Sequence, residues 1–301
     1  MLTTPLPPPL PKPGASILRF GESAAAAAAF GAGTASLSSD PEEALIAAFE
    51  AVQAQLEACA ALPTPSVDAR ESGACGTVAY LREGMLWVAG AGDCTAVLAT
   101  KRKQESSAGG GYDEFEALTL TTDHKVDHPA EQARIEAAGG AVRPAIYEEG
   151  EVVVPARMFE DLKDKRRGPG LAVSRGIGDL GAMRCGLIPT PEVRKHMLDV
   201  DADSFLILAS DGVWEFITPQ QAVDIVAPFY RDGKRAFAAC KWLIANAAAR
   251  WKHNEGDYRD DITAIVLWLP AVITALALEK TQSSRRLSRT DSQEALARAF
   301  S

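Results

Sequence analysis

The sequence predicts an α+β fold in which antiparallel β-sheets pack in layers against helices. Three observations support this class. Short apolar runs of strand length outnumber the helical segments, strands and helices occur in blocks, and Gly-containing turns join the first strands. Hydrophobic residues make up 47% and charged residues 24% of the 301 residues, a composition typical of globular proteins.

The elements are predicted from periodicity and from residues that begin and end helices. A helix is expected after Asp40, because Asp40-Pro41-Glu42-Glu43 provides an N-cap, a proline in the first turn and two acidic side chains. Turns at Glu83-Gly84 and Gly92-Asp93 predict two antiparallel hairpins. Residues 141–203 are expected to be irregular with short strands. The remaining expected strands are 76–83, 85–91, 94–100, 116–121, 204–210 and 262–269, and the remaining helices are 129–138, 219–228 and 233–250.

Changes in composition divide the chain into three predicted parts. Residues 1–39 form a Pro- and Ala-rich leader that we expect to be disordered, residues 40–275 form the folded domain, and residues 276–301 form a polar tail. The leader also suits a docking site for a Pro-reading partner or an organelle transit peptide. In the tail, Ser288 follows two arginines in a pattern that basophilic kinases favour.

Charge and cysteine content exclude several classes of protein. A net charge of −9 argues against nucleic-acid binding, which needs a basic face. The five cysteines are scattered without CxxC spacing, so neither a disulfide framework nor a structural zinc site is expected, and a reducing compartment, the cytoplasm or nucleus, is favoured. The longest apolar run, 264–278, is interrupted by Pro270 and is too short to cross a membrane. We expect it to form a strand followed by a short packed segment. We also expect the protein to be a monomer.

Two familiar motifs lack their required context. Residues 176–181 match GxGxxG, but prolines follow soon after and Asp179 would repel a pyrophosphate. His124 and His128 have the spacing of zinc ligands on a helix, but Pro129 follows at once and Lys125 stands where such helices have Glu. We therefore expect neither dinucleotide nor zinc binding.

Three acidic residues lie at the ends of predicted core strands. Asp93 follows strand 85–91, Asp211 follows strand 204–210, and Asp260 precedes strand 262–269. Each alone is typical of a turn. Together, at one edge, they provide the clustered carboxylates that Mg²⁺ or Mn²⁺ prefers.

The order of motifs resembles the metal-dependent serine/threonine protein phosphatases of the type 2C, or PPM, family. The resemblance covers about residues 40–270. It rests on SGACGTVAYL (72–81), LWVAGAGDCTAVL (86–98), LTTDHKVDHPAEQARIEAAGG (120–140), LAVSRGIGDL (171–180), PEV (191–193), FLILASDGVWEFIT (205–218) and DDITAIVLWL (260–269).

This resemblance implies a fold, a reaction and a set of site residues. The fold would be two packed antiparallel β-sheets flanked by helices, and the reaction would be hydrolysis of phosphoserine or phosphothreonine in a phosphoprotein by a metal-activated water. Asp211 and Asp260 would bind Mg²⁺ or Mn²⁺, and Asp93 would bind a further, weaker metal. The resemblance also implies supporting roles for Glu131, Arg134, Arg175 and Asp179, and a tight turn at Gly212.

The chain also departs from the family pattern. The DGHGG segment and the RxxMED-like segment are not found, so the general-acid His and the phosphate-binding Arg remain unassigned and the domain is expected to be N-terminally incomplete. Before Ser72 the only aspartates are Asp40 and Asp68, and there is no histidine. The family's GDSR is Gly92-Asp93-Cys94-Thr95 in this chain. Three alternatives stay open: a shortened form of an active phosphatase, a pseudophosphatase that acts as a binding scaffold, and a divergent enzyme with replacement ligands.

Overall fold

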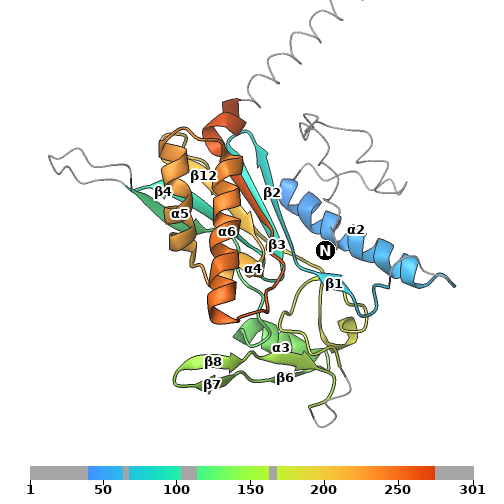
Figure 1. Ribbon diagram of the computed structural model, residues 1–301. Coiled ribbons are helices and arrows are strands. Elements are labelled where there is room, and N and C mark those ends of the chain that lie inside the picture. Colours follow the sequence, from blue (N-terminus) through green and yellow to red (C-terminus); the bar gives the residue numbers. More distant parts are fainter. Residues whose placement is uncertain (1–39, 64–67, 103–113, 163–167, 275–301) are drawn as a thin grey trace, which may run out of the picture. The chain divides into compact units, whose positions relative to one another are not determined.

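Two antiparallel sheets stand at the centre of the computed structural model, which describes residues 40–63, 68–102, 114–162 and 168–274 (Figure 1). One sheet has the strand order β11-β3-β2 and the other the order β13-β12-β4-β5. The strands are β2 (Gly76–Arg82), β3 (Met85–Ala91), β4 (Thr95–Lys101), β5 (Phe115–Thr119), β11 (Glu192–Met197), β12 (Asp203–Ala209) and β13 (Ala264–Trp268). The predicted fold class is therefore confirmed. The leader 1–39 and the tail 276–301, with Ser288, lie outside the described residues.

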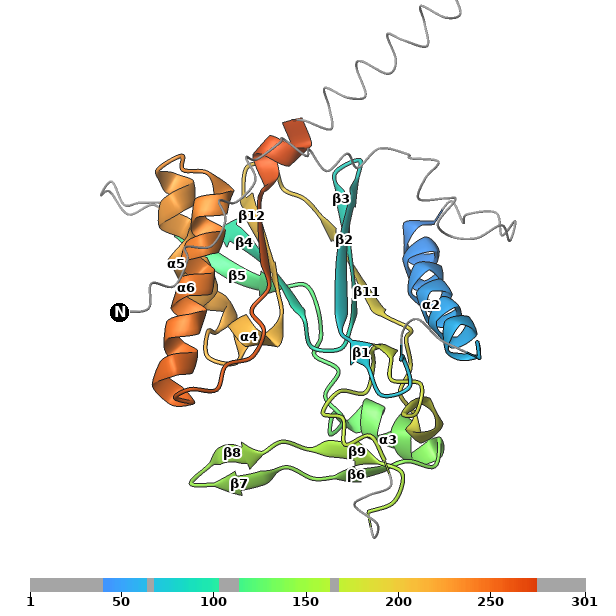
Figure 2. The same ribbon diagram turned by 45° about the vertical axis from the view of Figure 1, so that its right-hand side comes forward.

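Helices cover the outer faces of the two sheets (Figure 2). The helix α2 contacts the three-stranded sheet through Phe49, which packs on Ala89 and Ala91 of β3. The helices α5 and α6 cover the four-stranded sheet. The helices are α2 (Pro41–Ala60), α3 (Pro129–Ala137), α4 (Asp211–Trp214), α5 (Pro219–Arg231) and α6 (Ala236–Asn254).

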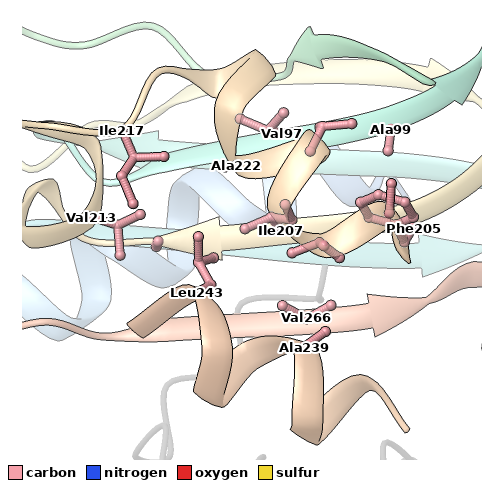
Figure 3. Close-up of a cluster of buried hydrophobic side chains, with 14 of the residues drawn as sticks. Val97, Ala99, Phe205, Ile207, Val213, Ile217, Ala222, Ala239, Leu243 and Val266 are labelled. Carbon is pink, nitrogen blue, oxygen red and sulfur yellow. The ribbon is translucent and has the colours of Figure 1, made fainter. Parts of the chain in front are cut away.

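The core lies in two layers on either side of the four-stranded sheet. Leu98 and Leu208 face the other sheet, where they meet Leu86 and Val88. The opposite face carries Val97, Ala99, Phe205 and Ile207, which pack against the helices. Figure 3 shows part of this second cluster, which also includes Val213, Ile217, Ala222, Ala239, Leu243 and Val266. Alternation along β4 and β12 thus places one set of side chains between the sheets and the other under the helices.

Most of the sequence-predicted elements are confirmed to within a few residues. Asp40 accepts a hydrogen bond from the Glu42 main chain at 3.0 Å, as the predicted N-cap. The helix predicted at 219–228 begins with a capping box formed by Thr218 and Gln221 and continues past Pro228 to Arg231.

The predicted hairpin at Gly92-Asp93 is wrong. The β3 strand pairs with β2 and β11, whereas β4 pairs with β12 and β5, so the chain crosses from one sheet to the other at this point. Gly92 has φ 104°, and a Cβ there would lie 2.2 Å from the Cys75 Sγ, so glycine is required. A Gly-Asp dipeptide between two apolar runs suits either a hairpin or a corner between sheets, and pairing decides which one forms.

A smaller group of short strands and α3 lies beside one end of the two sheets (Figure 2). Its pairs are β6 with β9, β7 with β8 and β1 with β10. The bounds are β1 (Gly73–Ala74), β6 (Ala141–Arg143), β7 (Ile146–Glu148), β8 (Glu151–Val154), β9 (Arg157–Phe159), β10 (Ile177–Gly178) and the 3-10 helix Met183–Cys185. This confirms the expectation of short strands within 141–203.

The apolar run at 264–278 forms β13 and then a helical segment at 269–274, as far as it is described. Ile273 of that segment packs against the cluster between the sheets. Within the described ranges, no helix is both long and apolar enough to cross a bilayer.

Candidate functional site

The three candidate carboxylates come from three strand ends. Asp93 follows β3 at the corner between the sheets, Asp211 is the first residue of α4 directly after β12, and Asp260 lies in the segment before β13. Asp93 is 8% exposed, and Asp211 and Asp260 are partly buried. The antiparallel pairing of β12 with β4 and β13 brings the end of β12 next to the beginnings of the other two strands.

Main-chain contacts hold the segments of Asp211 and Asp260 together. The Ser210 main-chain N–H donates to the Thr263 carbonyl at 3.0 Å, and the Ser210 hydroxyl donates to the Asp261 carbonyl at 3.1 Å. A Cβ on Gly212 would lie 2.3 Å from the Asp261 oxygen. Gly212 is therefore needed for the close approach of two main-chain segments, whereas the resemblance implied only a tight turn.

The charges at this edge repel one another. Burial raises the pKa of Asp211, and the negative charges of Asp93 and Asp260 raise it further. Asp93 and Asp260 are therefore near enough to act on the Asp211 carboxylate, and a cation bound beside Asp211 would offset this repulsion. Burial and the charges of Asp93, Asp211 and Asp123 likewise raise the pKa of Cys94 to about 11.

Lys125 supplies a positive charge at the centre of this cluster. Its Nζ lies 2.5 Å from the Asp93 Oδ2. Burial alone lowers the pKa of Lys125, but the hydrogen bond and charge of Asp93, with the charges of Asp123 and Asp211, outweigh burial and raise it. Asp93 also accepts a hydrogen bond from the Cys75 thiol at 3.2 Å, so both of its carboxylate oxygens are engaged.

The donor set suits a hard divalent cation in its chemistry and charge. Asp93, Asp211 and Asp260 supply oxygen donors, and one ammonium, Lys125, leaves an excess of negative charge among these four groups. Within the described ranges, no three His, Cys, Asp or Glu side chains stand close enough to form a preformed metal shell. The carboxylates fit Mg²⁺ or Mn²⁺ in charge and in oxygen chemistry alone, and their assignment as metal ligands stays a prediction.

A buried ionic network lies next to this site. Glu131 of α3 binds Arg175 at 2.7 Å and Arg134 at 2.6 Å, and accepts from the Ser174 hydroxyl at 2.6 Å. Burial alone would raise the pKa of Glu131, but these three hydrogen bonds lower it to about 2. The structural role that the resemblance implied for Glu131 and Arg134 agrees with these contacts.

Three residues of the GxGxxG and two-histidine motifs, Asp179, His124 and His128, differ in their surroundings. Asp179 has φ 46° and follows β10, so the GxGxxG match does not open a helix. His124 is buried against Gly92, whereas His128 is exposed just before α3. Sequence reasoning missed Lys125 and Cys75 as partners of Asp93; the only signal was that both lie in segments that resemble the family.

Comparison with known proteins identifies the family. The sequence model described as Protein phosphatase 2C matches residues 22–256. The chain belongs to the protein phosphatase 2C family, whose members are metal-dependent.

Curated plant proteins share about a third of the aligned residues. A rice protein named "Probable protein phosphatase 2C 48" is 36% identical over 225 residues, which is 74% of this chain and 58% of that protein. The rice "Probable protein phosphatase 2C 12" is 34% identical over 230 residues, covering 75% of this chain and 52% of its own length. The chain therefore spans somewhat more than half the length of these relatives.

Solved structures share the fold. A serine-threonine phosphatase 2C from Toxoplasma gondii superposes with a TM-score of 0.60 at 21% identity, covering 75% of this chain and 66% of that one. A sex determining protein of C. elegans gives 0.55 at 17% identity, covering 78% and 48%. At these identities the likeness concerns the fold alone.

Proposed function

We propose that this chain is a metal-dependent protein phosphatase that hydrolyses phosphoserine and phosphothreonine in phosphoprotein substrates. The observation that carries the proposal is the placement of Asp93, Asp211 and Asp260 at neighbouring strand ends, where burial and then the charges of Asp93 and Asp260 raise the pKa of Asp211. Membership of the protein phosphatase 2C family supports the reaction class. None of the five cysteines, which all lie within the described ranges, forms a disulfide bond, and this supports a reducing compartment such as the cytoplasm or nucleus.

In this proposal each carboxylate has a distinct part. Asp211 and Asp260 hold Mg²⁺ or Mn²⁺ on the segments that Ser210 ties together. Asp93 contributes to a second site that binds its metal ion more weakly, because a cation there must compete with the Lys125 ammonium for the Asp93 carboxylate. A bound Mg²⁺ or Mn²⁺ lowers the pKa of a water ligand and stabilises charge on phosphoryl oxygens.

The test measures phosphate release from a phosphothreonine peptide at millimolar Mn²⁺, with and without EDTA. Asp211→Asn keeps the size of the side chain and should lower kcat by about 10²-fold or more, because the group that holds the cation is lost. Asp232→Asn is the matched control, since Asp232 is exposed and paired with Lys234 at the end of α5. It should leave turnover unchanged.

Mn²⁺ binding, followed by the EPR signal of the free ion, gives a readout that does not need turnover. The proposal expects wild-type protein to bind Mn²⁺ and Asp211→Asn to bind it more weakly. Turnover that survives both EDTA and Asp211→Asn would contradict it. A folded wild-type protein without Mn²⁺ binding or turnover would favour the scaffold alternative.

A further inference from the structure

Glu131 joins three separate segments of the chain. It lies in the first turn of α3 and is 6% exposed. Arg134, which it binds, donates to the carbonyls of Gly186 and Ser174. Arg175 donates to the Thr190 carbonyl at 3.1 Å. One buried carboxylate thus fixes two guanidinium groups, which in turn fix the main chain at 174–175 and at 186–190.

The same network continues from Ser174 to His124. The Ser174 hydroxyl lies 2.6 Å from the Glu131 carboxylate, and its main-chain N–H donates to the His124 carbonyl at 2.8 Å. Ser174 has no exposed surface and the His124 side chain is 3% exposed. Neither contact is weakened by competition with water.

His124 then holds both polar groups of the Gly92 main chain. The His124 main-chain N–H donates to the Gly92 carbonyl at 3.0 Å, and the Gly92 N–H donates to the ring Nδ1 at 3.2 Å. The ring Nδ1 also lies 3.1 Å from the Gly92 carbonyl, so the tautomer decides which of these two groups it bonds, and Nε2 faces the Glu192 Oε2 at 3.7 Å. Burial and the positive charge of Arg175 lower the pKa of His124, which agrees with a neutral ring.

Gly92 directly precedes Asp93, and Lys125 directly follows His124. The segment that holds the Gly92 main chain therefore also carries the ammonium that binds the Asp93 carboxylate. We propose that Glu131 and His124 are positioning residues, which hold Asp93 at the carboxylate site through this buried chain of hydrogen bonds. The importance of this positioning for catalysis rests on the proposed function.

The network stabilises the fold, but stability by itself does not require ionic groups at these positions. Buried ionic groups can be replaced by apolar side chains of similar volume without loss of stability. Hydrogen-bond geometry, by contrast, fixes a direction. Here it fixes the corner at which the chain passes from β3 to β4, where Asp93 lies.

The first test follows the position of Asp93 without any metal. Cys75 lies against Gly92 and donates to Asp93, so its accessibility reports on that corner. Alkylation by iodoacetamide is measured by mass spectrometry in EDTA, relative to Cys240, whose thiol donates to a carbonyl at the start of β13. His124→Leu should accelerate the Cys75 reaction about threefold or more, by local opening of the corner.

Matched variants separate positioning from general damage. His124→Asn keeps a polar atom near the place of Nδ1 and should restore slow alkylation, whereas His128→Leu, on an exposed histidine four residues away, should have no effect. Ser174→Ala removes only a buried hydroxyl and should act in the same direction as His124→Leu, so it serves if that variant does not fold. Circular dichroism verifies folding in each case.

The second test asks whether His124 acts through Asp93. Mn²⁺ binding is measured by EPR for His124→Leu, Asp93→Asn and the double variant. Each single change should lower the affinity for the Asp93-dependent Mn²⁺ ion about tenfold. The double variant should bind this ion no more weakly than Asp93→Asn does.

The outcomes are distinct. Equal Cys75 alkylation in folded wild type and His124→Leu would overturn the proposal, as would additive losses in the double variant. If wild-type protein binds no Mn²⁺, the proposed function fails, and the alkylation experiment still decides whether the buried chain of hydrogen bonds through Ser174 and His124 positions Asp93.

Discussion

Replacement of Glu131 by glutamine gives the sharpest test of the buried network. The pKa of Glu131 is about 2 in the folded protein, against an ordinary value of 4.5. At about 1.4 kcal/mol per pKa unit, folding favours the charged form by roughly 3 kcal/mol. The side chain is 8% exposed, so solvent screening reduces this value little. Glu131→Gln should therefore lower the free energy of unfolding by about 3 kcal/mol at neutral pH, because Arg134 and Arg175 lose their counter-charge.

The same shift predicts the pH dependence. The folded pKa of Glu131 lies below the unfolded one, so its contribution is complete above about pH 5 and is lost as the pH falls from there toward about 2. The difference in stability between wild type and Glu131→Gln should shrink over that window. Other carboxylates titrate in both proteins and largely cancel in the difference.

The measurement is urea unfolding in EDTA at neutral pH and at about pH 3.5, within the window set by this linkage. Glu136→Gln is the control, because Glu136 is an exposed residue of the same helix whose carboxylate binds only Gln132 among the contacts that we find. It should change stability by no more than about 0.5 kcal/mol. A Glu131→Gln protein within about 1 kcal/mol of wild type at neutral pH would refute the electrostatic reasoning.

Three further predictions concern the site and the core. Asp211→Asn should raise the melting temperature of metal-free protein at neutral pH, because the folded pKa of Asp211 is raised; calorimetry should show this gain vanish as the pH falls below about 3.8. Gly92→Ala should cost at least about 2 kcal/mol more than Gly150→Ala in urea unfolding, because both have positive φ but only at Gly92 would the new Cβ overlap a thiol. Leu243→Ala should cost about 2–5 kcal/mol, because Leu243 is fully buried, whereas Leu62→Ala, at a residue 55% exposed, should cost less than about 0.5 kcal/mol. Equal costs within either pair would contradict the packing argument.

Local sequence was sufficient for the secondary structure. The helix after Asp40 has its cap, proline and acidic first turn within four residues, and β12 has a continuous apolar run buried on both faces. Signals of this kind lie within one element, so they can be recognised without knowing its neighbours. Strand pairing lies between elements, and for this reason the corner at Gly92-Asp93 was mistaken for a hairpin.

The site divides in the same way. The sequence by itself singled out Asp93, Asp211 and Asp260, because each carboxylate stands at the end of an apolar strand. Only the tertiary structure decided the surroundings of Asp93 and Asp211. Asp93 bonds Lys125 and Cys75, and Asp211 is subject to burial and to repulsion from Asp93 and Asp260. It also decided that Glu131, which is distant from Asp93 in the sequence, connects to Asp93 through Ser174 and His124. The physical reason is that electrostatic and hydrogen-bond energies depend on distances between segments, which residue spacing along one chain does not fix.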